Sequence, residues 1–203
     1  ADTIYRTLIV HPQAKAAFKV NNDVQCFKQQ KFIFTNQSSI KRGLLTYNWS
    51  FGDGSFSADT SYIKTYLKDS AYKIRLIASS EQNCRDTANL IVVLNPSPDA
   101  IFSIANNKQC FRGNSFNFTN QSGIAKGRIT NYEWQMGDGN THNTNGVSAY
   151  SYTSEDTFKV KLIAQSDKNC YDTLMKPAIV FAQPVAKFII PNDSQCWQKN
   201  FFV

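Results

Sequence analysis

The chain repeats itself, and the length of its repeat is the feature that most limits how it can fold. Three kinds of segment recur at separations of 84 to 86 residues. They are AKAAFKVNNDVQCF (14–27, again as PDAIFSIANNKQCF at 98–111 and PVAKFIIPNDSQCW at 184–197), FIFTNQS (32–38, again as FNFTNQS at 116–122) and LIASSEQNCRDT (76–87, again as LIAQSDKNCYDT at 162–173). A period of this length indicates a row of small domains of one kind.

The recurrences divide the chain into two whole repeats with a partial repeat on either side. Residues 13–97 and 98–183 are the whole repeats. Residues 1–12 resemble the last strand of a preceding repeat, and residues 184–203 resemble the first strand of a following one. We therefore expect this chain to be a piece of a longer tandem array.

Each repeat is expected to fold as an all-β domain. Apolar and charged residues alternate along several segments, for example where Ile74 lies between Lys73 and Arg75. Such a period of two is typical of strands with one buried and one exposed face, and no stretch shows a helical period. About seven short strands in about 85 residues predict a two-sheet sandwich. The sequence thus predicts tandem immunoglobulin-like β-sandwiches.

The net charge of +7 does not indicate a nucleic-acid-binding protein. The 22 basic residues are scattered singly, whereas a nucleic-acid site gathers them into a patch. A weak attraction to acidic polysaccharide or to a cell surface fits the charge better. The longest apolar run, residues 90–94, is far shorter than the roughly 18 residues of a membrane span, so no span is expected.

Five cysteines predict disulfides and hence an oxidising compartment, either the periplasm, the cell surface or the extracellular space. Each whole repeat has one early and one late cysteine, which favours the pairs Cys26–Cys84 and Cys110–Cys170 and leaves Cys196 to pair beyond the chain end. Bridges between neighbouring repeats, free thiols and a metal site remain as alternatives. Zinc is disfavoured because the chain has no Cys-x-x-Cys and only two histidines.

An aromatic run leads into a Gly-Asp-Gly turn in both repeats, as YNWSFGDGS at 47–55 and YEWQMGDGN at 132–140. We interpret each turn as structural: the tryptophan fills the core, the glycines supply positive φ, and the aspartate accepts local backbone hydrogen bonds. The residues concerned are Trp49, Gly52, Asp53, Gly54, Trp134, Gly137, Asp138 and Gly139. Calcium at Asp53 and Asp138 is a weaker alternative, because the second copy lacks further acidic ligands.

The same turn resembles the W-D-F-G-D-G-S signature of the PKD (polycystic kidney disease) domain. The segments AYKIRLIAS (71–79) and TFKVKLIAQS (157–166) resemble the family's G-T-Y-T-V-T-L-T-V strand. The copies depart from the signature where Ser50 and Gln135 replace the usual Asp and where Met136 replaces Phe. The resemblance implies tandem PKD-type sandwiches from a large Bacteroidota-type cell-surface or secreted protein, such as an adhesin or a gliding-motility filament.

An Asp-Thr pair followed by an apolar residue recurs at the late end of each repeat. This pattern resembles the O-glycosylation acceptor of Bacteroidota, which would place a glycan on Thr87 and Thr173. The alternative is that the aspartate caps a turn and the threonine begins the last strand.

The predicted function is that of a non-catalytic structural stalk or spacer whose partners are the neighbouring repeats of the same chain. Catalysis finds no support, because neither His11 nor His142 recurs in the other copy and no Gly-rich phosphate loop precedes a helix. No cofactor is expected.

Two other functions are possible for such repeats. One is a module that binds polysaccharide or other surface proteins through exposed aromatics, for which the candidates are Tyr5, Tyr62, Tyr66, Tyr150 and Tyr152; the alternative for these tyrosines is that they pack at a corner of the sandwich. The other is the accessory region of a secreted hydrolase, whose catalytic domain would lie outside these residues.

Overall fold

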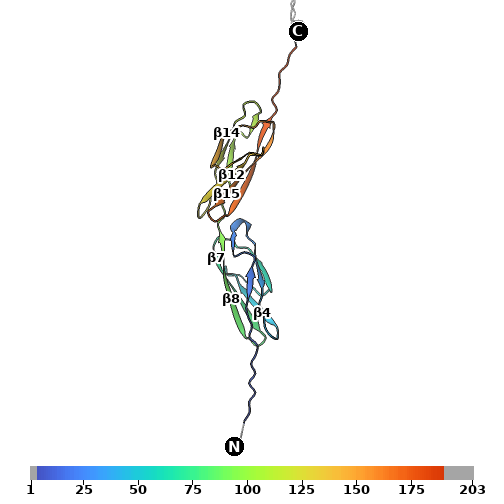
Figure 1. The fold of residues 1–203 in the computed structure, drawn as a ribbon, viewed down its shortest axis with the longest axis vertical. Helices are drawn as coiled ribbons and strands as arrows, with labels where there is room; N and C mark the ends of the chain where they lie inside the picture. The colour runs from blue at the N-terminus through green and yellow to red at the C-terminus, as the bar shows by residue number, and fades with distance from the viewer. Residues whose placement is uncertain (1–3, 190–203) are drawn as a thin grey trace, which may run out of the picture.

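The structure, a computed structural model, describes residues 4–189. They form two β-sandwiches arranged end to end, and the chain enters at one end of the pair and leaves at the other (Figure 1). Each sandwich packs a three-stranded sheet against a five-stranded sheet. The predicted all-β class and tandem immunoglobulin-like architecture are confirmed.

The first sandwich contains β1 (Phe18–Val20), β2 (Val24–Cys26), β3 (Phe32–Asn36), β4 (Leu45–Ser50), β5 (Phe56–Ser57), β6 (Ser61–Lys64), β7 (Ala71–Ser80) and β8 (Arg85–Asn95). A single turn of 3-10 helix, η1 (Phe27–Gln29), follows β2. The smaller sheet has the order β1-β3-β6, and the larger has the order β2-β8-β7-β4-β5.

The second sandwich contains β9 (Phe102–Ala105), β10 (Lys108–Cys110), β11 (Phe116–Asn120), β12 (Ile129–Gln135), β13 (Thr141–His142), β14 (Gly146–Tyr150), β15 (Asp156–Ser166) and β16 (Tyr171–Phe181). Its sheets have the orders β9-β11-β14 and β10-β16-β15-β12-β13. The two sandwiches therefore share one topology, strand for strand, as the sequence repeat requires.

The core of each sandwich lies between its two sheets and is rich in aromatic residues. Trp49 and Trp134 are fully buried at equivalent places, and their indole N–H groups donate to the backbone oxygens of Asp59 and Thr144. Phe18 packs edge-on against Trp49, with ring centroids 5.1 Å apart. The alternation in the sequence matches the structure of β7, in which Ile74 and Leu76 are buried while Lys73 and Arg75 are exposed.

One parallel pairing in each domain decides where the early cysteine lies. Strand β2 runs parallel to β8, so that Cys26 lies opposite Asn95 at the end of β8. Strand β10 pairs with β16 in the same way and places Cys110 opposite Phe181. Each early cysteine therefore lies at the end of its sandwich from which the chain leaves, far from the turn that precedes the last strand.

The segments outside the two sandwiches form no strand within the described residues. Residues 4–12 and 184–189, where we expected strands of further repeats, are without strand structure. A strand exists only beside another strand that satisfies its backbone groups, and these segments have no such neighbour here. The remaining end positions, including Cys196, lie outside the described residues. In residues 4–189 there is also no helix with the length and apolar character of a membrane span.

Candidate functional site at the domain junction

The two domains are joined by a disulfide between Cys26 and Cys170, whose Cα atoms are 5.5 Å apart and which lie 144 residues apart in the sequence. The predicted pairs Cys26–Cys84 and Cys110–Cys170 are therefore wrong. The bond follows instead the alternative of a bridge between neighbouring repeats. Among the described residues, Cys84 and Cys110 are free.

The reason for this correction is the parallel pairing described above. Cys26 lies beside the last residue of β8, whereas Cys84 lies just before its first residue. Eleven residues of strand separate the two ends, or about 35 Å at roughly 3.3 Å per residue. A disulfide requires Cα atoms within about 7 Å of each other. The early cysteine of one repeat can therefore reach only the late cysteine of the repeat that follows.

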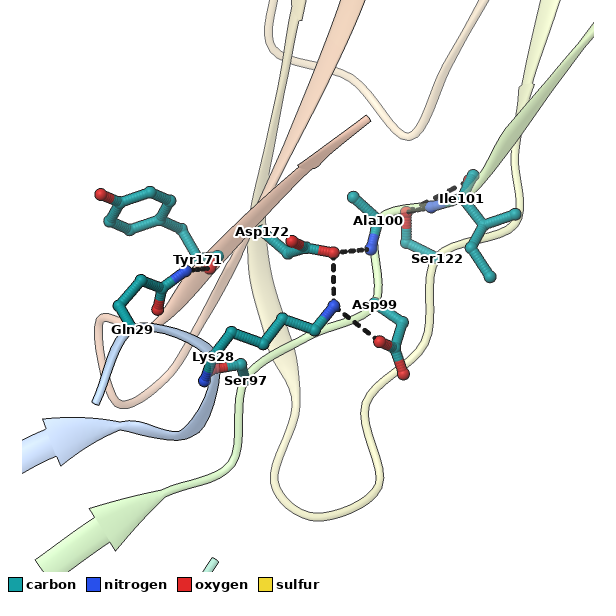
Figure 2. A network of polar contacts seen from close by, with 9 residues as sticks. All are labelled: Lys28, Gln29, Ser97, Asp99, Ala100, Ile101, Ser122, Tyr171 and Asp172. Carbon is teal, nitrogen blue, oxygen red and sulfur yellow. Dashed lines mark hydrogen bonds and ion pairs between the residues drawn. The ribbon is translucent and has the colours of Figure 1, made fainter. Parts of the chain in front are cut away.

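Lys28 lies at the centre of the polar contacts around this bond (Figure 2). Its ammonium group lies 2.6 Å from a carboxylate oxygen of Asp172 in the second domain and 2.7 Å from one of Asp99 in the linker. Partial burial disfavours the charged forms, but the hydrogen bonds and opposite charges prevail. They raise the pKa of Lys28 and lower the pKa of Asp172 from their ordinary values.

Three further contacts connect the domains and their linker. The side-chain amide of Gln29 donates to the backbone oxygen of Tyr171 at 3.0 Å, and the backbone N–H of Lys28 donates to the Ser97 hydroxyl (Figure 2). On another pair of loops, Lys126 of the second domain lies 3.0 Å from a carboxylate oxygen of Asp69 in the first. The disulfide is thus part of a larger contact with opposite charges on its two sides.

Asp172 has a second role within its own domain. Its carboxylate accepts a hydrogen bond from the backbone N–H of Ala100, just as Asp86 accepts one from Ala16 in the first domain. The recurring Asp-Thr pair therefore joins the start of each sandwich to its last strand. In the second domain the same carboxylate also forms an ion pair with Lys28. Sequence reasoning missed this contact, although a basic residue two places after the early cysteine, Lys28 or Arg112, was a signal for it.

The Gly-Asp-Gly turns are stabilised by local contacts. Asp53 accepts hydrogen bonds from the backbone and hydroxyl of Ser55 and lies 2.7 Å from the Lys64 ammonium group. Partial burial acts to raise the pKa of Asp53, but Lys64 and Ser55 hold it below its ordinary value. Gly52 has a φ of 78° and lies against the backbone of Lys73.

The second turn replaces the lysine with a tyrosine. Asp138 accepts hydrogen bonds from the Tyr150 hydroxyl and from Asn140. Burial, followed by the bond to Asp138, raises the pKa of Tyr150 to about 12. Within residues 4–189, no group of three or more His, Cys, Asp or Glu side chains is placed to hold a metal ion. Calcium binding at Asp53 and Asp138 stays a prediction.

The structure separates the five candidate tyrosines into core and surface residues. Tyr66 and Tyr152 are buried, and their hydroxyls donate to the backbone oxygens of Phe51 and Met136. These two tyrosines therefore pack in the core and offer no exposed aromatic surface for a ligand. Tyr62 stacks on Phe51, and of the five only Tyr5, which precedes the first sandwich, is largely exposed.

The two threonines predicted to carry glycans lie at equivalent exposed positions. Thr87 and Thr173 are near the starts of β8 and β16, where their side chains face solvent. This placement leaves room for a glycan on each, and the modification itself stays a prediction.

Both sandwiches match the same protein family. A family model described as a PKD domain matches residues 10–93 and again residues 95–178. A search of curated proteins found no match.

Several solved structures resemble this chain at low sequence identity. One is the PKD1 domain of Vibrio anguillarum Epp, with 20% identity over 41% of this chain and 94% of that chain, and a TM-score of 0.36. Another is the PKD1 domain from the Vibrio cholerae metalloprotease PrtV, with 23% identity over 42% of this chain and 99% of that chain, and a TM-score of 0.34. The fibronectin(III)-like modules of Clostridium thermocellum CbhA match 84% of this chain and 94% of theirs, with 12% identity and a TM-score of 0.41.

Proposed function

The chain belongs to the PKD domain family, of which it contains two tandem copies, and we propose on this premise that it is a non-catalytic stalk segment of a long extracellular repeat protein. Such a segment holds a functional tip at a distance from the cell. The parent protein we propose is a large cell-surface or secreted protein of the Bacteroidota type, such as an adhesin or a gliding-motility filament.

The observation that carries this proposal is the Cys26–Cys170 disulfide across the junction. Tandem domains joined only by a linker move relative to one another by default. Here the linker forms one connection between the domains, and the disulfide forms a second. Two connections with ion pairs between them resist bending, which is the property that a stalk needs and that a catalytic module does not.

The disulfide also supports the extracellular location. Structural disulfides persist in oxidising surroundings and are rare in the cytosol. We propose neighbouring repeats of the same protein as the partners of this segment, with cell-surface polysaccharide or other surface proteins as partners of the tip.

Small-angle X-ray scattering on the purified chain tests the stalk directly. We expect the oxidised protein to behave as a single extended particle and the double variant Cys26→Ser, Cys170→Ser to show a broader distribution of interdomain distances. The matched control is Cys84→Ser, Cys110→Ser, which removes two thiols and leaves the junction intact. If the oxidised protein is as flexible as the Cys26→Ser, Cys170→Ser variant, the stalk proposal is wrong.

A further inference from the structure

The residues that join the two domains recur at the two outer ends of the pair. Because each sandwich repeats the same topology, every junction residue of one domain has an equivalent in the other. We call the equivalents on the first domain the N-terminal face and those on the second domain the C-terminal face. The N-terminal face consists of Arg42, Cys84 and Asp86, and the C-terminal face consists of Cys110, Arg112 and Glu155.

The cysteines of the two faces are equivalent to the pair that forms the disulfide. Cys110 corresponds to Cys26, since both end a short strand that runs parallel to the last strand of the domain. Cys84 corresponds to Cys170. The backbone N–H of each donates to the hydroxyl of a serine four residues earlier, and the asparagine before each has φ near 60°. The turn that presents the bonded cysteine is thus already formed around the free one.

The charges of the two faces are complementary in the same sense as at the junction. Arg112 takes the place of Lys28, and Asp86 takes the place of its partner Asp172. The second ion pair of the junction, Lys126 with Asp69, has its equivalents in Arg42 and Glu155. The C-terminal face therefore offers a cation and an anion in positions that match an anion and a cation of the N-terminal face.

We propose that the C-terminal face is the docking surface for the repeat that follows in the tandem array, with a disulfide from Cys110 to the late cysteine of that repeat, and that the N-terminal face of a second copy of this chain, which presents Cys84, occupies the same surface when two such segments meet. This inference rests on the proposed stalk function, for which it names the contact between successive segments. A head-to-tail contact of this kind does not close on itself and so extends into a filament.

Bond formation removes one proton from each thiol and passes two electrons to an oxidising disulfide, which is reduced to two thiols. No other co-reactant is required. Cys110 is exposed and Cys84 is half-buried, so a thiol of another molecule can reach both.

Three contacts of the junction do not recur, and they define where this docking differs. The Ser97 hydroxyl, which accepts a hydrogen bond from the backbone of Lys28, corresponds to Gln183. Gln29, which reaches Tyr171, corresponds to Gly113 and so loses its side chain. Asp99 corresponds to Lys15, which would meet the incoming Arg112 with like charge. The contact between two copies is therefore expected to be weaker than the internal junction, and Lys15→Asp should strengthen it.

Thiol–disulfide exchange between two single-thiol variants tests the proposal. Both carry Cys196→Ser and retain the Cys26–Cys170 bond. The first variant adds Cys84→Ser and has its Cys110 activated as a mixed disulfide with thionitrobenzoate. The second adds Cys110→Ser and presents the Cys84 thiolate, which attacks the Cys110 sulfur. Thionitrobenzoate then leaves with the electron pair of the broken bond, and its colour reports the rate.

We expect the Cys110-with-Cys84 reaction to be roughly tenfold faster than either the Cys110-with-Cys110 or the Cys84-with-Cys84 reaction, because opposite charges steer the encounter. The rates are divided by those of each variant with glutathione, which corrects for the reactivity of the thiol itself. The advantage should fall in about 1 M salt. Arg112→Glu should remove it, and Asp86→Lys on the partner molecule should restore it.

Equal corrected rates for the three pairings would overturn the docking proposal. Such a result would leave the stalk function standing if scattering still shows a single extended particle, because that measurement depends on the internal junction alone. A flexible particle together with a fast Cys110-with-Cys84 reaction would overturn the stalk function and leave the docking proposal standing.

Discussion

Cys26 and Cys170 belong to different domains, yet they form one disulfide whose Cα atoms are 5.5 Å apart. The bond connects the end of a short strand in the first sandwich to the turn before the last strand in the second. It therefore couples the two domains rather than closing a loop within one of them.

Removal of the junction disulfide should make the pair less stable. In the chain-entropy model, closing a loop of 144 residues stabilises the folded pair by about 5 kcal/mol, and engineered cases often fall below such a value. We expect the variant Cys26→Ser, Cys170→Ser to lose up to about this free energy of unfolding in urea titrations. The variant Cys84→Ser, Cys110→Ser should unfold as the wild type does. Equal losses in the two variants would show that the internal bond does not couple the domains.

The role of Asp172 at the junction can be separated from its role inside the domain. Asp172→Ala removes both the hydrogen bond from Ala100 and the ion pair with Lys28, whereas Asp86→Ala removes only the equivalent bond from Ala16. We expect Asp172→Ala alone to increase interdomain flexibility in scattering experiments. Because Lys28 and Asp172 are partly exposed, the ion pair should contribute no more than about 1 kcal/mol. If the two substitutions change interdomain flexibility equally, Asp172 does not stabilise the junction.

The junction should respond to pH only far from neutrality. Asp172 has a pKa below its ordinary 3.8, so its contribution is complete above that value and is lost as pH falls through the lowered pKa. Lys28 has a pKa above its ordinary 10.5, so its contribution is complete below that value and is lost as pH rises through the raised pKa. Scattering from the variant Cys26→Ser, Cys170→Ser should therefore be constant between about pH 5 and pH 9. A change in shape near pH 6 or 7 would contradict this assignment.

The two glycines of one turn should differ in how well they tolerate alanine. Both have positive φ, but a Cβ at Gly52 would lie 2.9 Å from the backbone nitrogen of Lys73, whereas a Cβ at Gly54 would meet nothing within 4 Å. We expect Gly54→Ala to cost about 1 kcal/mol for its backbone conformation and Gly52→Ala to cost about 3 kcal/mol or more. Urea unfolding of the two variants gives the comparison. If both substitutions lower the free energy of unfolding equally, close packing against Lys73 is not the reason that position 52 requires glycine.

The repeat in the sequence was sufficient to predict the all-β class, the tandem sandwiches and the buried Trp49 and Trp134. These depend on local alternation and on residue size, which can be read from the order of residues alone. The Gly-Asp-Gly turns were predictable for the same reason, since positive φ at Gly52 and Gly54 is a local property.

The disulfide could not be predicted because its pairing depends on which end of the sandwich each cysteine occupies. The early and late cysteines of one repeat are 58 residues apart in the first copy, a spacing compatible with either a bond within the domain or a bond between domains. Only the parallel pairing of β2 with β8 decides between them, and parallel pairing leaves no local signature in three residues. Lys28 was missed for the same reason, since its partner Asp172 lies 144 residues away.

Single-molecule pulling on the two ends of the chain tests the coupling of the domains most directly. With Cys26 bonded to Cys170, force passes across the junction and the residues between them cannot extend. We therefore expect the oxidised protein to release no segment from between these cysteines, and reductant to release about 500 Å of additional length from the 144-residue separation. Two successive domain-unfolding steps in the oxidised protein, with loops of only 58 and 60 residues released by reductant, would contradict the account, because they would place the bonds within the domains.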